Sequence, residues 1–295
     1  MLERIAEALG ARDVRRGPRI QSLWGGYGEA FRIDVLDGPV SSAVVKHVCP
    51  GPASGHSHAR KLRSYAVEAT FYEQYAARLG PGARIPSPLW IHRDESAWCF
   101  VLEDLDAAGF RGRTRQPDRD ALCAMVHWLA HFHASFVDTR PRGLWKVGSY
   151  WHLATRPDEL SAMPGGPLKR RAMAIDRRLA RSRFRTLIHG DAKPANFCIS
   201  GTGVAAVDFQ YVGGGVGVVD LAYLLHGLSP AQQQPLVEDY FAVLRGLVGD
   251  AYPELETEWR ALYPWAQLDF CRFLVGWSPG YRPNREEKAL IRALL

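Results

Sequence analysis

Short runs of hydrophobic residues, separated by Gly, Pro and Asp, mark the first third of the chain as rich in strands. Val, Ile, Phe and Trp favour strands, and turn residues between such runs are typical of a sheet. The predicted strands are Ile20–Trp24, Phe31–Val35, Ser42–Val48 and Trp98–Leu102. Two stretches, Leu2–Leu9 and Val67–Tyr72, have helical spacing instead. We therefore predict an antiparallel sheet with helices beside it.

The rest of the chain shows mainly helical periodicity. From about Asp118, hydrophobic residues recur at helical spacing and predict one buried stripe, formed by Leu122, Met125, Leu129, Phe132 and Phe136. A second stripe is formed by Leu168, Ala172, Ile175 and Leu179. Strands gathered in the first part and helices in the second part predict an α+β fold.

One segment of this helical part has a different pattern. An apolar run leads into His189-Gly-Asp-Ala-Lys-Pro-Ala-Asn196, and two further apolar runs, Phe197–Ile199 and Val204–Val207, follow it and end at Asp208. Glycines between these two runs predict a hairpin turn. We expect the hairpin and the polar segment before it to hold three polar side chains at one mouth.

These three side chains suit phosphoryl transfer, which requires a base to orient the attacking hydroxyl and oxygen ligands for Mg²⁺. Asp191 is the predicted base, five residues before Asn196, as in the catalytic loop of kinases. Asn196 and Asp208 are the predicted Mg²⁺ ligands, because Mg²⁺ prefers hard oxygen atoms and usually takes only a few from the protein. The alternative interpretation is a solvated, Asp-rich turn.

Lys193 adds a cation two residues after the predicted base. A lysine at this point can stabilise the negative charge that develops on the transferred phosphoryl group. We predict a catalytic role for Lys193, with a solvated loop lysine as the alternative.

These residues carry a family resemblance. The segments HGDAKPANF, VDFQ and VVDLAYLL resemble the aminoglycoside-phosphotransferase-like kinases, which include the choline kinases. The chain looks most similar to the ecdysteroid-kinase-like branch, in which Asp-Phe-Gln replaces Asp-Phe-Gly. The resemblance implies a bilobal, protein-kinase-like fold with ATP and Mg²⁺ between the lobes. It further implies an N-terminal nucleotide-binding lobe over residues 1–105 and a C-terminal catalytic and acceptor-binding lobe over residues 106–295.

The chain departs from the usual pattern of this family at Lys193. The small-molecule kinases more often carry His or Trp in place of Lys193, and Asp-x-Lys-Pro-x-Asn is the pattern of serine/threonine protein kinases.

Asp220 corresponds to the aspartate that ties down the catalytic loop in the family, and its place before Leu221 predicts a helix N-cap. We predict a structural role for Asp220.

The predicted sheet supplies candidates for binding the nucleotide. Lys46 follows Ala43-Val44-Val45 as in the lysine-bearing third strand of kinases, and Glu68 on the next helix would form the ion pair that aligns it with the phosphates. Glu73 is an alternative partner, and an edge-strand lysine that reaches solvent is an alternative role for Lys46.

Two backbone sites complete this set. Gly26 and Gly28 lie in a predicted hairpin turn whose amides could approach phosphates, although hairpins use glycine for backbone reasons alone. The resemblance also places the hinge near Glu103 and Leu105, where backbone N–H and C=O groups would bind the adenine edge.

Charge and composition narrow the possible partners. The 295 residues carry a net charge of +6, but eight basic residues and one acid lie between Lys169 and Arg185. The basicity is therefore one segment with a helix face that is solvated or attracts an anionic partner. It contains a single aromatic residue, Phe184, and not the series of aromatic platforms that a single-stranded nucleic acid requires. We predict no nucleic acid and no membrane, because no apolar run approaches a membrane span and no signal sequence is present.

Five scattered cysteines without a CxxC pair predict reduced core thiols. A cytoplasmic protein is expected because no apolar run approaches a membrane span and the N-terminal residues include acids and form no apolar h-region. The segment Val237–Phe270 combines acids with Trp259, Tyr263 and Trp265, which could hold a cationic acceptor or could be core aromatics beside solvated acids.

The sequence thus predicts an ATP-dependent kinase that phosphorylates a hydroxyl of a small molecule. Three alternatives remain: a nucleotide-binding pseudokinase, a protein kinase, and a metal-dependent hydrolase using His189, Asp191 and Asp208. No Ala-Pro-Glu segment follows Asp208, and little length for an activation segment precedes Asp220, which disfavours a protein kinase. The oligomeric state and the acceptor are not predicted.

Overall fold

The computed structural model describes residues 1–52, 54–94 and 97–295. They divide into two compact units. The first unit comprises residues 1–79, 84–113 and 197–207, and the second comprises residues 80–83, 114–196 and 208–295. The units do not follow a single cut in the sequence, and the division between residues 105 and 106 stays a prediction about the functional lobes.

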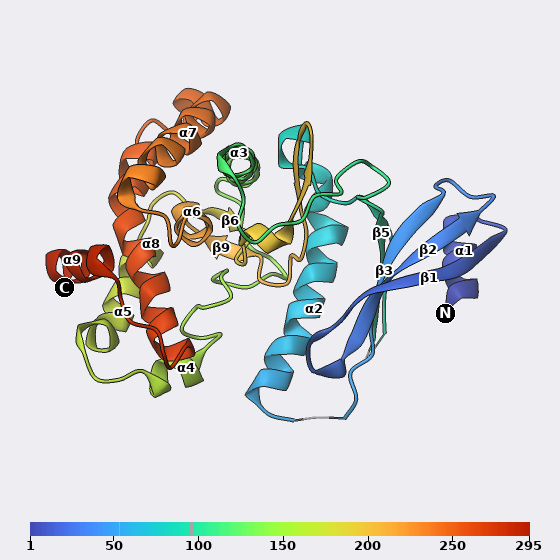
Figure 1. Ribbon diagram of the computed structural model, residues 1–295, viewed down its shortest axis with the longest axis horizontal. Coiled ribbons are helices and arrows are strands. Elements are labelled where there is room, and N and C mark those ends of the chain that lie inside the picture. Colours follow the sequence, from blue (N-terminus) through green and yellow to red (C-terminus); the bar gives the residue numbers. More distant parts are fainter. Residues whose placement is uncertain (53, 95–96) are drawn as a thin grey trace. The chain divides into compact units, whose positions relative to one another are not determined.

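The first unit is built on a five-stranded antiparallel sheet (Figure 1). Its strand order is β1-β2-β3-β5-β4. The strands are β1 (Asp13–Ser22), β2 (Gly28–Leu36), β3 (Ser42–Val48), β4 (Pro88–Arg93) and β5 (Trp98–Glu103). β3 is central and matches its predicted bounds, whereas β1 begins well before Ile20 because its N-terminal half also pairs with β2.

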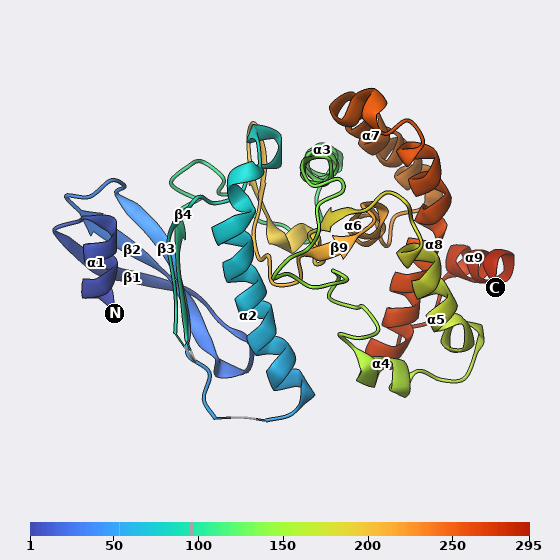
Figure 2. The same cartoon turned by 180° about the vertical axis from the view of Figure 1, so that it is seen from behind.

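Two helices cover the opposite faces of this sheet (Figure 1). Helix α1 (Leu2–Leu9) ends at Gly10, whose φ of 62° is left-handed, and packs Ile5 and Leu9 on the apolar face of the strands. Helix α2 (His56–Gln74) packs against β4 and β5 on the other face (Figure 2). There the ring of Tyr72 meets Phe100 at 6.5 Å between centroids.

A second, two-stranded sheet belongs to the first unit although it lies far along the chain. It is the hairpin of β7 (Phe197–Ser200) and β8 (Gly203–Ala206), as the sequence predicted. Ile199 of the hairpin pairs with Gly112, and Cys198 packs against Leu105. Short 3-10 turns complete the unit at Trp24–Gly26 and Ala76–Arg78.

The second unit is mainly helical. Its helices are α3 (Arg119–Ser135), α4 (Pro157–Ala162), α5 (Pro167–Ala180), α6 (Val218–Leu224), α7 (Pro230–Val248), α8 (Leu255–Trp277) and α9 (Arg285–Leu294). α8 packs against α4, α5, α6 and α9 (Figure 1). Asp118, Ser229 and Asn284 cap α3, α7 and α9 through their side chains. Two short strands, β6 (Thr186–Ile188) and β9 (Gly213–Gly215), pair antiparallel.

Several local predictions need correction. Asp220 lies inside α6 and not at its N-cap, which is Gly217, because the helix begins at Val218. Cys49 is exposed and Cys123 is half-buried, so only Cys99, Cys198 and Cys271 are the buried thiols that the sequence predicted. All five thiols are free.

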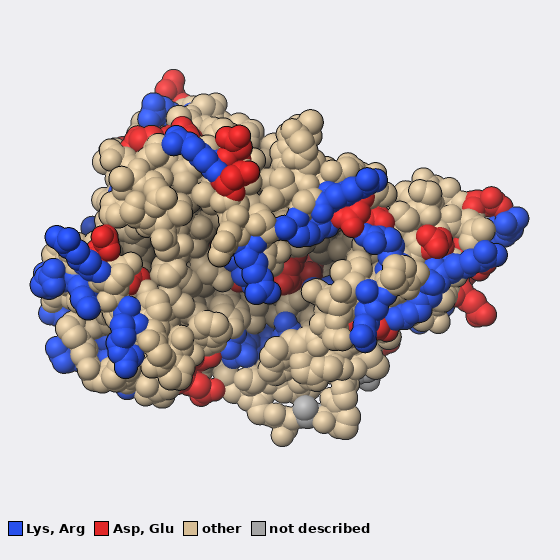
Figure 3. Space-filling view, in the orientation of Figure 1, with Lys and Arg blue, Asp and Glu red and all other residues tan. Residues whose placement is uncertain are grey.

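The basic segment forms an amphipathic helix, as its spacing predicted. Leu168, Ala172 and Ile175 of α5 are buried, while the arginines at 170, 171, 177, 178 and 181 are exposed. Figure 3 shows basic side chains gathered over the region of α5 and α9. Trp259, in contrast, is fully buried and donates its Nε1–H to the carbonyl of Phe184, which favours the core interpretation for this residue. No helix in the described ranges combines the length and apolarity that crossing a bilayer demands.

Candidate active site

The loop after β6 holds the predicted base, and α6 holds the loop. The Asp220 carboxylate accepts the backbone N–H of His189 at 2.6 Å and that of Gly190 at 2.9 Å. Gly190 has a φ of 79°, and a Cβ there would lie 2.2 Å from the carbonyl oxygen of Tyr211. Only glycine fits this close approach. The predicted structural role of Asp220 therefore has a direct physical basis in these two bonds.

A buried histidine, His133, also holds the Asp220 carboxylate. The fully buried His133 lies between Asp220, 3.2 Å from its Nε2, and the Tyr240 hydroxyl, 2.8 Å from its Nδ1. The Thr186 hydroxyl donates to the carbonyl of His133 at 2.7 Å, which ties β6 to α3. His133 is thus a buried histidine that braces Asp220 and, through it, the loop that holds Asp191.

Asp191 is a buried carboxylate with unequal oxygens. Its Oδ2 accepts from Lys193 Nζ at 2.7 Å and from Asn196 Nδ2 at 3.0 Å. Its Oδ1 is buried and has no hydrogen-bond partner among the described residues. Burial raises the pKa of Asp191 above its usual range, the positive charge of Lys193 opposes this, and the negative charge of Asp208 adds to it. A buried carboxylate with a free oxygen is suited to accept a proton.

Lys193 contacts Asp191 directly. Burial lowers the pKa of Lys193, but the charge of Asp191, the hydrogen bond to it and the charge of Asp208 together outweigh this effect, and the pKa rises. The side chain is 40% exposed, so the ammonium group is reachable from solvent while it remains on Asp191. The alternative of a purely solvated loop lysine does not describe this pairing.

Asn196 and Asp208 have the features that a magnesium site requires. Asn196 ends a 3-10 turn (Pro194–Asn196) and directs its Nδ2 to the carbonyl and side chain of Asp191, which leaves its Oδ1 for another ligand. Asp208 has a φ of 70°, in the left-handed region, and its charge acts on both Asp191 and Lys193. One amide oxygen and one carboxylate are a sufficient protein contribution for Mg²⁺.

The first unit contains the predicted lysine and glutamate pair. Lys46 Nζ lies 2.6 Å from Oε2 and 2.9 Å from Oε1 of Glu68, and both side chains are largely buried. Glu73, the alternative partner, lies 3.4 Å from Arg93. Lys46 is therefore an interior lysine and not an edge-strand lysine that reaches solvent.

The predicted glycines have structural reasons of their own. A Cβ at Gly28 would lie 2.0 Å from the carbonyl oxygen of His47, so the β2–β3 contact admits only glycine. Gly26 has a φ of 73° and donates its N–H to the carbonyl of Leu23 at 3.2 Å. A phosphate-binding role for either glycine stays a prediction.

At the predicted hinge, the backbone N–H of Glu103 donates to the carbonyl of Ser87 at 2.9 Å. The carbonyl of Leu105 accepts from Phe110 at 2.8 Å, and its N–H has no hydrogen-bond partner among the described residues. The Leu105 N–H is thus available to an adenine edge, and the Glu103 N–H is not.

Comparison with known proteins decides the family. Residues 20–264 match the model of the phosphotransferase enzyme family. The chain belongs to this family. No curated protein matches this phosphotransferase by sequence.

Solved structures support the fold of this phosphotransferase. A microcompartment-associated aminopropanol kinase has 16% identity and a TM-score of 0.54, over 99% of this chain and 94% of the other. An amicoumacin kinase, solved with AMP-PNP, Ca²⁺ and Ami, has 14% identity and a TM-score of 0.55, over 92% and 85%. A choline kinase from Cryptosporidium parvum has 8% identity and a TM-score of 0.54, over 95% and 87%. The predicted kinase-like α+β fold and family are confirmed, and the ecdysteroid-kinase-like branch stays a prediction.

Sequence patterns missed three residues next to the catalytic loop of this phosphotransferase. The Tyr150 N–H donates to the carbonyl of Gly190 at 2.7 Å, and Ser149 before it has a φ of 102°. Tyr223 lies one helical turn after Asp220, and burial, followed by the charge of Asp191, raises the pKa of Tyr223. Ser149 and Tyr150 have no periodicity or motif that marks them, and Tyr223 lies in the VVDLAYLL segment without a pattern that singles it out, because contact with the loop arises only in the fold.

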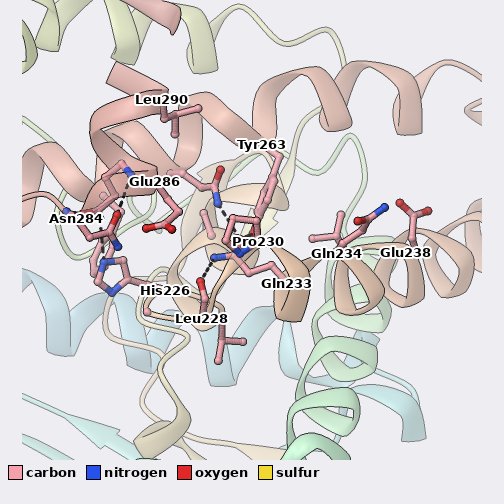
Figure 4. Close-up of a pocket in the computed structure, with 16 residues that line it drawn as sticks. His226, Leu228, Pro230, Gln233, Gln234, Glu238, Tyr263, Asn284, Glu286 and Leu290 are labelled. Atoms are coloured by element: carbon pink, nitrogen blue, oxygen red, sulfur yellow. Dashed lines mark hydrogen bonds and ion pairs between the residues drawn. The ribbon is translucent and has the colours of Figure 1, made fainter. Parts of the chain in front are cut away.

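The same unit of this phosphotransferase contains a cavity of about 390 Å³ among α6, α7, α8 and α9 (Figure 4). Figure 4 shows His226, Asn284 and Glu286 towards one end of it and Gln234 and Glu238 towards the other. Its lining includes no residue of the segment from 187 to 208. The cavity is therefore separate from the residues predicted for phosphoryl transfer, which are called the transfer residues: Asp191, Lys193, Asn196 and Asp208.

Proposed function

We propose that the chain transfers the γ-phosphoryl group of ATP to a hydroxyl of a small-molecule acceptor. Family membership supports phosphotransfer, and the neighbouring structures named above are kinases of small molecules. The observation that carries the proposal is the Asp191 carboxylate, buried, held by Lys193 and Asn196 through one oxygen and unpartnered at the other.

In this proposal Asp191 orients the acceptor hydroxyl and takes its proton at Oδ1. A carboxyl whose pKa is raised by burial is a stronger base than a solvated aspartate, which favours proton acceptance near neutral pH. Lys193 holds Oδ2 and stabilises the charge on the transferred group, so the two oxygens of Asp191 have different tasks.

Asn196 and Asp208 would hold Mg²⁺, which when bound neutralises the charge of the phosphate oxygens. Asn196 also fixes the base, because its Nδ2 bonds both the backbone and the side chain of Asp191. Loss of the Asn196 side chain would therefore affect both the metal ligand and the orientation of the base.

In the first unit, Lys46 would bind the α- and β-phosphates while Glu68 holds its ammonium group. We further propose that the N–H of Leu105 binds the adenine edge, together with backbone groups near Glu103, and that amides near Gly26 and Gly28 approach the phosphates. These assignments rest on the family pattern and on the Lys46–Glu68 bond.

The test is acceptor-dependent release of ADP from Mg-ATP over a panel of hydroxyl compounds, repeated with Asp191→Asn. We expect kcat to fall by about 10³-fold or more while ATP affinity stays within about twofold, because Asp191 acts on the acceptor and not on the nucleotide. Asp176→Asn is the matched control, since Asp176 is a hydrogen-bonded aspartate of the same unit that contacts His152.

An Asp191→Asn variant with wild-type kcat on an active acceptor would contradict the assigned base. Tight Mg-ATP binding with no ADP release above background for any acceptor would favour a pseudokinase. Mg²⁺ binding and hydrolysis of a phosphate ester without nucleotide would favour the metal-dependent hydrolase.

A further inference from the structure

The segment at residues 148–151 packs against the loop that holds Asp191, and its residue Ser149 has a strained backbone. Ser149 has a φ of 102°, which is unfavourable for a residue with a side chain, and it is 4% exposed. A Cβ at Gly190 would lie 2.7 Å from the Ser149 nitrogen, so the two backbones are in close contact. The Tyr150 N–H then bonds the Gly190 carbonyl. The strain and this bond fix Tyr150 beside the residue that precedes Asp191.

Aromatic side chains continue from Tyr150 to the surface. The ring of Tyr150 meets Phe273 of α8 edge-on at 5.7 Å, and Phe273 stacks on Trp277 at 5.8 Å. Trp277 is 52% exposed, which is unusual for so large an apolar side chain. Tyr223, one helical turn after Asp220 in α6, meets Trp151 edge-on at 4.8 Å and packs its ring on Phe270 at 4.6 Å, and Phe270 meets Phe273 at 6.2 Å. We call this set the aromatic wall; it consists of Tyr150, Tyr223, Phe273 and Trp277.

The charged groups beside the aromatic wall are mostly paired already. Arg156 places its guanidinium 3.9 Å from the centre of the Tyr150 ring and donates to Glu159 at 3.1 Å. Asp269 accepts from the fully buried Arg272 at 2.9 Å and from Trp151 Nε1 at 3.0 Å. The carboxylates of Glu159 and Asp269 thus each face an arginine, whereas Asp191 faces Lys193.

This arrangement disfavours a cationic ligand. A cation is attracted to the face of a tyrosine ring, but Arg156 already occupies a face of Tyr150. Lys193 adds a second positive charge at the base end of the wall. The buried Oε2 of Glu159 and Oδ1 of Asp191 have no hydrogen-bond partner among the described residues, and a cation could use either, but Asp191 Oδ1 is the proposed acceptor of the hydroxyl proton. An uncharged, flat or alicyclic ligand meets no such opposition and gains apolar contact.

We propose that the aromatic wall binds the body of the acceptor and that the acceptor is an uncharged alcohol that contains a ring. This inference rests on the proposed function, because it places the ring against Tyr150 and Tyr223 and the hydroxyl at Asp191 Oδ1. Trp277 extends the contact for acceptors with more than one ring.

The test is calorimetric titration of the full chain, without ATP, with 2-phenylethanol, 2-naphthylethanol, ethanolamine and choline. The naphthyl alcohol is expected to bind at least about tenfold more tightly than choline, and more tightly than the phenyl alcohol, because it buries more apolar area. Trp277→Ala should weaken naphthylethanol binding by about threefold or more. Met173→Ala, which also shortens a 52% exposed apolar side chain of this unit, should leave the affinity unchanged.

Tyr150→Phe and Tyr150→Ala separate the ring from the fold. Phe keeps the ring and should keep the affinity within about twofold, whereas Ala should reduce it by about tenfold or more. Preserved thermal unfolding of Tyr150→Ala shows that the loss belongs to the site. Tighter binding of choline or ethanolamine, no binding of either ring alcohol, or an affinity that is indifferent to Tyr150→Ala would each overturn the proposal.

Failure of the proposed function has a different signature. ADP release that responds only to amino alcohols would keep the phosphotransferase and remove the ring acceptor. Ring-alcohol binding that depends on Trp277 and Tyr150, with no ADP release for any acceptor, would keep the aromatic wall as a ligand site and remove the transfer reaction.

Discussion

Two regions of the second unit differ in how completely their polar groups are satisfied. Among the transfer residues, the buried carboxylate of Asp191 has an oxygen, Oδ1, without a partner among the described residues. In the same region, two residues other than glycine, Ser149 and Asp208, have a positive φ. At the cavity among α6 to α9, the lining residue Gln233 accepts from Tyr263 at 2.8 Å, and the lining residue Glu287 accepts from Tyr281, which lies beside the cavity, at 2.5 Å. The cavity has the space, and the transfer residues have the unsatisfied groups.

The difference has a physical origin. A buried polar atom without a partner costs free energy, and backbone strain costs more, so both persist only where the surrounding contacts enforce them. The bonds from Asp220 to His189 and Gly190 are such contacts. Open volume requires no such enforcement. Unsatisfied and strained groups therefore indicate the chemistry better than cavity volume does.

The largest effect on stability and activity is expected when the bonds from Asp220 to His189 and Gly190 are removed. Asp220→Ala leaves two buried backbone N–H groups without an acceptor and removes one of the two side-chain partners of His133. We expect a loss of about 3–5 kcal/mol in the free energy of unfolding, measured with urea, together with loss of transfer activity. Asp250→Ala, at an exposed aspartate after α7, is the control and should change the stability by less than about 0.5 kcal/mol. A loss below about 1 kcal/mol for Asp220→Ala would show that the loop is held by other contacts.

Relieving the strain at Asp208 should separate stability from activity. Asp208→Gly removes the unfavourable φ of 70° and the proposed metal ligand together. Transfer activity is expected to fall by about 10²-fold or more, while stability stays equal or rises by up to about 1 kcal/mol. Asp37→Gly relieves a φ of 51° at an exposed turn and should give the same change in stability with unchanged activity. A destabilised Asp208→Gly variant with retained activity would contradict both roles.

Sequence patterns predicted the parts of this arrangement that lie close along the chain. Asp191, Lys193 and Asn196 fall within six residues, so a single turn brings them together. Lys46 and Glu68 were also predicted, because a strand lysine in an apolar run requires a buried partner and the next helix offers Glu68. In both cases the local pattern already contained the physical requirement.

Other features depend on contacts that no local pattern contains. Asp220 precedes a hydrophobic run and was predicted as an N-cap, but α6 begins at Val218, and the Asp220 carboxylate bonds the backbone N–H groups of residues 189 and 190 instead of its own helix end. Tyr150 contacts Gly190 only because a strained Ser149 turns the backbone towards it. The strand β6 pairs with β9 across the loop, a pairing between residues far apart in sequence. Strain and long-range pairing are properties of the folded chain.

A smaller effect concerns the pH dependence of stability. Because burial raises the pKa of Asp191 in the folded chain, the folded state binds the proton more tightly than the unfolded state. The stability that this carboxyl contributes is present below its ordinary pKa and is lost as pH rises through the folded pKa. Asp191→Asn should therefore be more stable than the wild type at pH 8 and closer to it at pH 4, by urea unfolding at each pH. A variant less stable at pH 8 would show that the bond to Lys193 outweighs burial.

The smallest effect is expected in the cavity among α6 to α9. Tyr281→Phe removes the hydroxyl that donates to Glu287 and that lies 3.3 Å from His226, while the ring remains. The free energy of unfolding should fall by about 1 kcal/mol, the usual contribution of one hydrogen bond, and kcat should not change. Tyr263→Phe, which removes the bond to Gln233 on the opposite wall, should behave alike. A fall in kcat of more than about threefold in either variant, at unchanged ATP affinity, would mean that the cavity takes part in transfer, because loss of one distant hydrogen bond cannot otherwise reach the Asp191 carboxylate.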